Sequence, residues 1–444
     1  MFYTFIVAFM VISFFTLMYA HGYRFNWVWP PKPSLIFQKT GMLLVKTRPK
    51  EATILLNGKN PRAIRKQIPP RGELDPVQSP AKIRRISPGS YNLKLRKEGY
   101  HDWQREVEVY PGQITSLIDI RLIKDEIPLK IFEVEINKDT LSPSRRYALN
   151  RDGDKIIDIS KENTILLPGD IATSSPKWSP DEKKILLGTK IFSLSQEKTI
   201  SELPIPKENI EAEWGKNSKH IYYRPDKTLM EMKVETRDTR KIITSEGTTT
   251  DLLVKNDLIY IMIGRENNSE LHVYSPKQKK TIKKIDFPLS SAYHMADTPD
   301  RGKLTVYDKN YNTLYIISPL NPISPLRETV NNVKFFQWNN KKEIIYGNNF
   351  EIWKLDVDHH NRTLLTRRSE KINGVIPHPE TRKIIYYTDN KINIIEETGP
   401  NKIEKTELTE LPTISDVFLG RQKQELYFNS RIGHHQGFYK LAIY

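Results

Sequence analysis

PKWSPDEKKILL, at residues 176–187, is the clearest copy of a unit that recurs along this chain of 444 residues. It opens with a short strand pattern around Trp178, turns at Ser179-Pro180-Asp181 and continues into the apolar strand pattern Ile185-Leu186-Leu187. Weaker copies keep a first strand, a polar turn and an apolar strand, at a period of roughly 40 residues. They run from Leu141-Ser142-Pro143 to Lys155–Ile157, from Glu213-Trp214-Gly215 to His220–Tyr223, from Leu253-Val254 to Leu258–Tyr260, from His294-Met295 to Leu304–Tyr307, from Phe336–Trp338 to Ile344–Tyr346, from Val375–Pro377 to Ile384–Tyr387 and from Val417–Leu419 to Leu426–Phe428.

A unit of this length has room for about four strands, which is the size of one blade of a β-propeller. We therefore predict an all-β propeller of seven or eight blades over residues 126–444, with eight favoured by the number of copies. The last copy, which ends at Phe438–Tyr444, is one strand short. The apolar hexapeptide Ile131–Ile136 is predicted to supply that strand, which closes the ring and removes its exposed edges.

The element Trp-Ser-Pro-Asp-x-Lys-x-Ile at residues 178–185 is similar to the repeats of TolB-like and related WD40-like propellers. Only this copy matches well. The resemblance therefore implies the architecture and does not imply a particular partner.

Residues 41–125 show a different pattern, in which apolar and polar residues alternate. Tyr91, Leu93 and Leu95 alternate with Asn92, Lys94 and Arg96, as a half-buried strand requires. Similar short strands precede the turn at Asn57-Gly58 and follow the turn at Pro111-Gly112. We expect an antiparallel β-sandwich of five or six strands.

This module resembles the PEGA domain, a small β-sandwich found mainly in surface or envelope proteins of prokaryotes, often beside a membrane anchor. The resemblance rests on Pro49-Lys50-Glu51-Ala52, Asn57-Gly58, Pro88-Gly89-Ser90-Tyr91, Gly99-Tyr100 and Pro111-Gly112. The chain departs from the family at Lys50-Glu51, where the motif has Glu-Gly, and in a longer basic, Pro-rich stretch between Gly58 and Ile86. The resemblance implies a fold, and it transfers no catalytic residue.

The first 20 residues, MFYTFIVAFMVISFFTLMYA, contain no charged side chain, no Gly and no Pro. About 20 apolar residues in a helix span the hydrocarbon core of a bilayer. We predict a transmembrane anchor at residues 1–23, followed by a proline-rich stem at 24–40, in which Pro30, Pro31 and Pro33 stop any helix. The alternative is a cleaved signal peptide, against which stand the missing basic region and the absence of a small-residue cleavage site.

The orientation of the anchor has two possible answers. Arg24 and Lys32 follow the apolar segment and no basic residue precedes it, so the positive-inside rule alone favours a cytoplasmic C-terminal side. Long folded domains translocate largely regardless of charge, and the modules that follow resemble extracytoplasmic ones. We therefore expect a single-pass protein of the cell membrane with its C-terminal domains outside the cytoplasm.

The net charge of +16 is concentrated in the first soluble module, where residues 41–124 carry 17 Lys and Arg against eight Asp and Glu. Such a basic patch is drawn to lipid headgroups or to an anionic envelope polymer. The alternative is an ordinary solvated basic loop, whereas nothing beyond charge favours nucleic acid. The candidate binding residues are Lys59, Arg62, Arg65, Lys66, Arg71, Lys82, Arg84 and Arg85.

The sequence offers no catalytic or cofactor motif and, because it has no Cys, no thiolate chemistry. Asn150, Asp152 and Asp154 have the spacing of a calcium loop, but Lys155 and Lys161 stand where a Gly and a carboxylate are needed, so we expect a hairpin turn. Two further clusters are expected to be solvated loops rather than metal sites, since adjacent His residues on a strand point to opposite faces. They are Asp356, Asp358, His359 and His360 in one cluster and His434 with His435 in the other.

Together these features predict a membrane-anchored cell-envelope protein that presents a β-propeller as a binding or scaffolding platform. Its partner on the propeller face would be a protein or a glycan. The alternative is a propeller-based hydrolase or lyase that acts on cell-wall glycans or peptides. That alternative requires an acid, a base or a nucleophile in the channel, which no local motif reveals.

Overall fold

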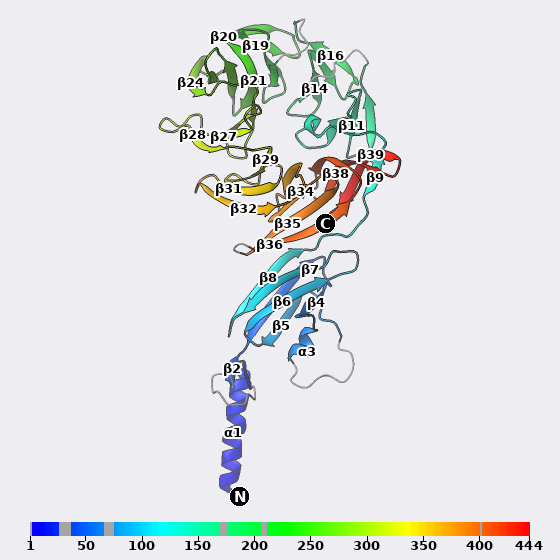
Figure 1. The fold of residues 1–444 in the computed structure, drawn as a ribbon, viewed down its shortest axis with the longest axis vertical. Coiled ribbons are helices and arrows are strands. Elements are labelled where there is room, and N and C mark those ends of the chain that lie inside the picture. The colour runs from blue at the N-terminus through cyan, green and yellow to red at the C-terminus, as the bar shows by residue number, and fades with distance from the viewer. Residues whose placement is uncertain (1, 26–36, 66–74, 169–175, 206–210, 400–401) are drawn as a thin grey trace. The chain divides into compact units, whose positions relative to one another are not determined.

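The computed structural model describes residues 2–25, 37–65, 75–168, 176–205, 211–399 and 402–444. The chain divides into two compact units. Unit 1 comprises Met1–Ile127 together with Ala442–Tyr444, and unit 2 comprises Pro128–Leu441. Strands dominate both units (Figure 1), which confirms the all-β prediction.

Unit 1 begins with helix α1 (Phe2–Ala20), in which no side chain is charged. The helix ends well before the prolines that were expected to stop it, because Gly22 adopts a left-handed backbone conformation (φ +83°). Next, β1 (Tyr23–Phe25) pairs antiparallel with β2 (Phe37–Lys39), so the ends of the predicted stem form a short ladder. The three prolines of the stem lie outside the described residues.

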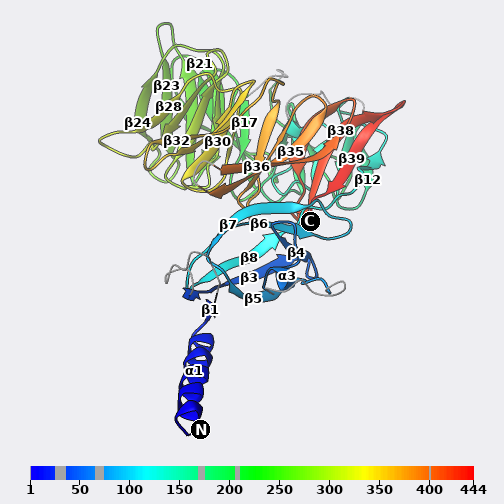
Figure 2. The same cartoon turned by 60° about the horizontal axis from the view of Figure 1, so that its bottom comes forward.

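The rest of unit 1 is a β-sandwich of two three-stranded sheets, with strand orders β5-β3-β8 and β4-β6-β7. Figure 2 shows β3, β5 and β8 together in one layer. The elements are β3 (Gly41–Arg48), β4 (Thr53–Leu56), α3 (Pro61–Arg65), β5 (Ala81–Ile86), β6 (Gly89–Arg96), β7 (Trp103–Val109) and β8 (Ile114–Arg121).

The six strands agree with the prediction, but the expectation of a purely antiparallel sandwich is wrong. Strand β8 runs parallel to β3, with Met42 opposite Ile114 and Leu44 opposite Ser116. The chain crosses from β7 in one sheet to β8 in the other, so β8 is not the hairpin partner of the strand before it. Alternation along a strand reports which face is buried and carries no information on the direction of the neighbouring strand.

The core of the sandwich comes from the alternating positions of β3, β4 and β6. Leu43, Ile54, Leu93 and Leu95 are fully buried, and each contributes about 1.5–3 kcal/mol relative to an exposed side chain. The predicted turn at Asn57-Gly58 is confirmed, since the residues that flank it exchange two backbone hydrogen bonds of 2.9 Å.

Unit 2 consists of eight sheets, here termed blades 1 to 8, arranged around a common centre (Figure 1). Blade 1 contains β10 (Tyr147–Leu149), β11 (Lys155–Asp158) and β12 (Asn163–Leu166), preceded by the 3-10 helix η1 (Lys138–Thr140). Blade 2 contains β13 (Lys177–Trp178), β14 (Lys184–Leu187), β15 (Lys190–Ser193) and β16 (Lys198–Glu202), and blade 3 contains β17 (Glu211–Trp214), β18 (His220–Arg224), β19 (Thr228–Lys233) and β20 (Thr239–Thr244). Blade 4 contains β21 (Thr248–Lys255), β22 (Leu258–Gly264), β23 (Ser269–Ser275) and β24 (Lys280–Phe287).

The remaining blades repeat the four-stranded order. Blade 5 contains β25 (Tyr293–Ala296), β26 (Leu304–Asp308), β27 (Thr313–Ile317) and β28 (Leu326–Val330), and blade 6 contains β29 (Phe335–Trp338), β30 (Glu343–Gly347), β31 (Glu351–Asp356) and β32 (Asn361–Arg367). Blade 7 contains β33 (Gly374–Pro377), β34 (Lys383–Tyr387), β35 (Lys391–Gly399) and β36 (Lys402–Glu410). Blade 8 contains β37 (Ile414–Leu419), β38 (Glu425–Ile432), β39 (His435–Ala442) and β9 (Leu129–Phe132).

The first turn of the repeat has the same backbone geometry in blades whose sequences differ. The N–H of Ser179 donates to the carbonyl five residues later at 2.9 Å, as do those of Ser142, Gly215, His378 and Gly420 in other blades. In the first copy this turn leads to β10, and Lys155 begins the following strand, which corrects the predicted alignment of that copy. The period in the sequence therefore corresponds to one blade.

Tryptophan side chains join neighbouring blades. The indole N–H of Trp178 in blade 2 donates to the carbonyl oxygen of Thr140 in blade 1 at 2.7 Å. That of Trp214 in blade 3 donates to the carbonyl oxygen of Lys177 in blade 2 at 2.8 Å. The rings also pack into apolar clusters between these blades, so one residue type supplies both burial and orientation.

Blade 8 is completed by the first strand of unit 2, as predicted. Strand β9 pairs antiparallel with β39, with Phe132 opposite Phe438, and lies beside it in Figure 1. The strand comprises Leu129–Phe132 rather than Ile131–Ile136, because the chain leaves blade 8 after Phe132 and Ile136 forms a bridge with Asn150 of blade 1.

Aromatic rings from all four strands of blade 8 form one cluster. Phe418, Tyr427 and Phe438 stack with ring centroids 5.6–5.9 Å apart, and Phe132 of β9 lies 6.4 Å from Phe438. Gly437 lets β9 approach, because a Cβ at this position would lie 2.3 Å from the carbonyl oxygen of Phe132.

We predict that Gly437→Ala destabilises unit 2 by about 1–3 kcal/mol, because the added methyl group displaces the backbone of β9. Thermal or urea unfolding of the purified protein measures the change. Gly302→Ala is the matched control, since a Cβ there meets no atom closer than 3.5 Å. Equal stability of the two variants would contradict closure of blade 8 through β9.

Candidate functional site

The predicted basic residues fall in several places on unit 1. Lys59 lies in the exposed turn after β4, and Arg62 lies on α3, where its guanidinium is 3.5 Å from the carboxylate of Asp75. Arg85 has a left-handed backbone conformation, and its guanidinium carbon lies 3.7 Å from the ring centroid of Tyr19. Lys66, Arg71 and the side chain of Arg65 lie outside the described residues.

Lys82 and Arg84 lie together on the outer face of the sheet β5-β3-β8. They are exposed and alternate with the buried Ile83. In register, Lys82 is opposite Leu44 and Arg84 is opposite Met42, both half-buried side chains of β3. This face therefore joins positive charge to apolar surface.

Strand β8 extends the apolar part of this face. Ile114 and Ile118 are 61% and 57% exposed and belong to the strand on the other side of β3. Positive charge next to exposed aliphatic side chains is the combination that favours the headgroup region of an anionic bilayer. We term Met42, Leu44, Lys46, Lys82, Arg84, Ile114 and Ile118 the basic-apolar face.

Helix α1 is the one helix among the described residues that is long and apolar enough to cross a membrane. None of its residues is buried by the rest of the described protein. An N-terminal signal sequence has the same properties. The helix is therefore a candidate membrane span.

The inner strands of unit 2 surround the centre of the propeller. The first strands of consecutive blades are neighbours in two runs, β13–β17–β21–β25 and β29–β33–β37–η1. In a β-propeller the innermost strands of the blades surround a central channel, where sites are assembled from several blades. The two runs carry different chemistry.

The first run, from blades 2 to 5, carries carboxylates with basic partners. The Nζ atom of Lys177 lies 3.1 Å from Oε2 of Glu213, whose side chain is only 19% exposed. The buried Asp251 accepts a hydrogen bond from the backbone N–H of Met295 and lies 3.4 Å from Nδ1 of His294. Burial alone would lower the pKa of Lys177, but Glu213 and nearby acids raise it, so this lysine stays charged.

Glu211, at the start of β17, is the carboxyl group in this run that lacks a close cationic partner among the described residues. Burial, reinforced by the negative charge of Asp251, raises the pKa of Glu211 above its ordinary value, and Lys177 opposes the shift. A carboxyl group in such a setting holds its proton at a higher pH than usual. This is the property of a general acid.

Because the pKa of Glu211 is raised on folding, its contribution to stability is complete below the unfolded pKa, about 4.3, and is lost as pH rises through the folded pKa. Gln mimics the protonated form at every pH. We predict that the melting temperature of Glu211→Gln exceeds that of the unmutated protein by a margin that grows from pH 4 to pH 7, as followed by calorimetry. Glu235→Gln, which removes an exposed carboxylate from the same blade, is the control, and a margin that shrinks with pH would contradict the prediction.

The second run, from blades 6, 7 and 8 to η1, lines a cavity of about 320 Å³. Lys138 of η1 donates from Nζ to the hydroxyl oxygen of Tyr387 at 2.8 Å. Arg145 of blade 1 and the residues Phe335 and Phe336 of blade 6 also line this cavity. The two halves of the channel thus differ, with carboxylates in one and cations beside aromatic rings in the other.

The candidate calcium loop is a hairpin turn between β10 and β11, as expected. The side-chain amide of Asn150 donates to Asp154 at 2.6 Å, and its oxygen accepts the N–H of Lys155 at 2.9 Å. Both polar atoms of the Asn150 side chain therefore serve to close the turn.

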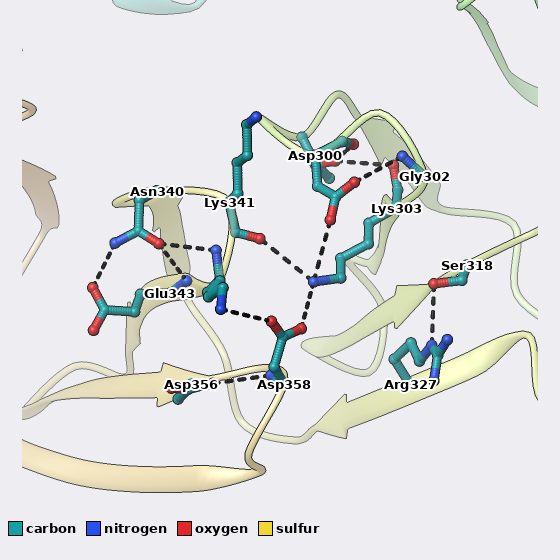
Figure 3. A network of polar contacts seen from close by, with 12 residues as sticks. Asp300, Gly302, Lys303, Ser318, Arg327, Asn340, Lys341, Glu343, Asp356 and Asp358 are labelled. Atoms are coloured by element: carbon teal, nitrogen blue, oxygen red, sulfur yellow. Dashed lines mark hydrogen bonds and ion pairs between the residues drawn. The ribbon is translucent and has the colours of Figure 1, made fainter.

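The cluster at residues 356–360 lies in the turn between β31 and β32. Asp356 accepts the backbone N–H groups of Asp358 and His359, each at 3.0 Å. Figure 3 shows Asp358 paired with Lys303, at 2.8 Å, which also contacts Asp300 and the carbonyl oxygen of Lys341. Within the described residues, no group of three or more His, Asp or Glu side chains is arranged to hold a metal ion.

The second histidine pair lies at the turn between β38 and β39, where both His434 and His435 are exposed. The exposed-loop expectation therefore describes this turn correctly. The same expectation describes His359 and His360, since both are exposed. The Nδ1 atom of His359 contacts Asp356, and that of His360 contacts Glu328.

Comparison with known proteins agrees with these two units. Residues 76–124 match the PEGA domain, which confirms the resemblance read from the sequence. Among solved structures, the chain is similar to the Dos1 propeller, with a TM-score of 0.52, 10% identity and coverage of 72% of this chain and 95% of that one. It is also similar to a eukaryotic initiation factor, with a TM-score of 0.50, 13% identity and coverage of 68% and 87%.

No match is found among curated proteins compared by sequence. At these identities the structural likeness shows the fold alone. The chain therefore carries a PEGA domain followed by a β-propeller, and its function has to be argued from its own residues.

The channel residues were missed in the sequence because no local motif contains them. One signal was present, since Lys177, Glu213 and Gln337 each immediately precede the Trp of their own first strand. Superposing the copies places the three residues at one position of the inner strand. The repeat therefore predicts the position just before each Trp. Because a Lys, a Glu and a Gln occupy it in different copies, this position indicates a binding site rather than a part of the hydrophobic core.

Proposed function

We propose that this protein is a membrane-anchored binding platform, in which α1 holds the chain in a bilayer and the propeller binds a ligand or partner. The observation that carries the proposal is that α1 is apolar over 19 residues and that none of these residues is buried by the rest of the described protein. A helix of that length rises about 28 Å, close to the thickness of the hydrocarbon core. Leaving this surface in water would be strongly unfavourable.

Val7→Arg combined with Val11→Arg is expected to release the protein from membranes. Each charge near the helix centre costs about 2.5–3.5 kcal/mol in the bilayer. Carbonate extraction of membranes followed by immunoblotting measures the release. Phe2→Arg is the matched control, because a charge at the helix end reaches the headgroups and is expected to leave the protein in the membrane fraction.

Two results would overturn the anchor. One is extraction of the unmutated protein by carbonate, and the other is a mature protein whose mass shows that residues 1–20 have been removed. Our proposal also places the C-terminal units outside the cytoplasm in a cell envelope. Protease added to intact cells would then digest unit 2, and protection of unit 2 would reverse the orientation.

We assign the basic-apolar face of unit 1 to contact with anionic headgroups or an anionic envelope polymer. Its support is that Lys82 and Arg84 lie beside Leu44 and Met42 on one sheet face, in the unit that also contains α1. Each Lys or Arg close to an anionic surface contributes roughly 1 kcal/mol.

The double variant Lys82→Gln and Arg84→Gln, in protein beginning at Gly41, is expected to bind anionic vesicles roughly 10- to 30-fold more weakly. Vesicle sedimentation at low and high salt measures this, and the binding of the unmutated protein should fall with salt. The control removes two exposed lysines from unit 2, Lys183→Gln and Lys219→Gln. An equal loss of affinity in both variants would show that binding depends on the net charge of the protein, which would refute a dedicated face.

A hydrolase or lyase of wall glycans or peptides is the second candidate function. One observation favours it, the raised pKa of Glu211 beside Asp251, which suits a general acid. Glu211→Gln separates the two candidates. An enzyme would lose turnover of such a polymer, whereas a binding platform has no turnover to lose.

A further inference from the structure

The cavity between blades 6, 7, 8 and 1 has a wall that is suited to one kind of ligand. At about 320 Å³ it is at the small end of ligand pockets. Phe335, Phe336 and Val417 supply its apolar part, and Gln337 and Asn373 supply side-chain amides. Its charged members are Lys138, Asp139 and Arg145.

Arg145 has more hydrogen-bond donors than partners. Its Nη1 donates to the carbonyl oxygen of Leu419 in blade 8 at 2.8 Å, and a guanidinium has five N–H donors in all. Across the described chain, no carboxylate lies within 4.0 Å of it in an ion pair. Burial lowers the pKa of Arg145, and no neighbouring charge is among the causes of the shift.

The position of Arg145 in the repeat shows that its side chain is not required for the turn. Arg145, Glu182, Ser218 and Lys423 occupy the same place in the first turn of their blades, and all have φ between 55° and 61°. At this place blades 2, 3 and 8 have a carboxylate, a hydroxyl and an ammonium group. The repeat therefore dictates the backbone, and the guanidinium at the cavity is specific to blade 1.

Lys138 adds a second cation and orients a hydroxyl group. Its Nζ donates to the Tyr387 oxygen, which leaves the hydroxyl proton of Tyr387 to donate to another acceptor. Asp139 contributes one negative charge to the same wall. The three charged groups of the wall sum to +1, and Asp416, which accepts the backbone N–H of Lys138 at 3.5 Å, adds a negative charge behind them. This balance favours a ligand with one negative charge over a polyanion.

We propose that this cavity binds a small organic carboxylate, with the carboxylate held by Arg145 and Lys138 and the body of the ligand against the apolar part of the wall. Arg145 matches the planar oxygens of a carboxylate, and the apolar lining residues accept the carbon skeleton of a small ligand. This inference deepens the proposed binding role by naming a ligand class. It does not depend on the membrane anchor, because it is tested by ligand binding and not by membrane partition.

The test uses the full chain in lipid nanodiscs and two matched pairs of probes, benzoate with benzamide and glucuronate with glucose. Saturation-transfer NMR detects binding, and titration calorimetry measures it. We expect at least one acid to bind in preference to its neutral partner. Arg145→Gln is expected to weaken that acid roughly 10-fold or more.

The control variant is Arg431→Gln. Arg431 is also an arginine that donates to a backbone carbonyl, at 3.2 Å to Gly433, but it is exposed on β38 and does not line the cavity. It is expected to bind the acid as the unmutated protein does. Lys138→Gln provides a second test if Arg145→Gln fails to fold, as judged by its melting curve.

Three results would overturn the proposal. The first is that neither acid binds, and the second is that each neutral partner binds as well as its acid. The third is that folded Arg145→Gln or Lys138→Gln binds the acid as tightly as Arg431→Gln does.

Discussion

The pairing of β9 with β39 is the contact on which the rest of unit 2 depends. Without β9, blade 8 would expose the edge of β39, and blades 1 and 8 would each expose the face that lies between them. These surfaces are covered only when the two ends of the unit meet. The cluster of four aromatic rings in blade 8 includes Phe132 of β9, and the backbone of that strand fits because Gly437 has no side chain. Closure therefore combines ladder hydrogen bonds, ring stacking and a steric allowance at one residue.

Closure also brings η1 and the first turn of blade 1 to the cavity that blades 6, 7 and 8 line. After β9 the chain passes to Ile136, whose N–H and carbonyl groups are both held by the side chain of Asn429 in blade 8. This contact sets η1, and with it Lys138, beside blade 8. Arg145 then reaches the carbonyl oxygen of Leu419. The cations of the channel thus lie where the two ends of the propeller are joined.

A repeated backbone with unequal side chains explains the difference between the two halves of the channel. The shared turn hydrogen bond and the tryptophan contacts keep the inner strands in equivalent positions. The turn does not fix the residue types of these strands, so blades 2 to 5 carry Glu211, Glu213 and Asp251, whereas blades 6 to 8 carry aromatic and amide side chains, of which Phe335 and Phe336 also pack against the core. An asymmetric lining of this kind suits recognition of a ligand with distinct ends.

Periodicity along the chain was enough to predict features whose cause is local. The period of the repeat corresponds to eight blades, the apolar run of residues 1–20 to helix α1, and Asn57-Gly58 to its turn. The strand that completes the last blade was also predicted, because the sequence shows a last copy that is one strand short and an unassigned strand before the first copy. Only the tertiary structure decided the parallel direction of β8, the bounds of β9 and the meeting of Arg145 with Lys138 at one cavity. These features depend on which strands become neighbours in space, and alternation within a strand carries no record of its neighbour.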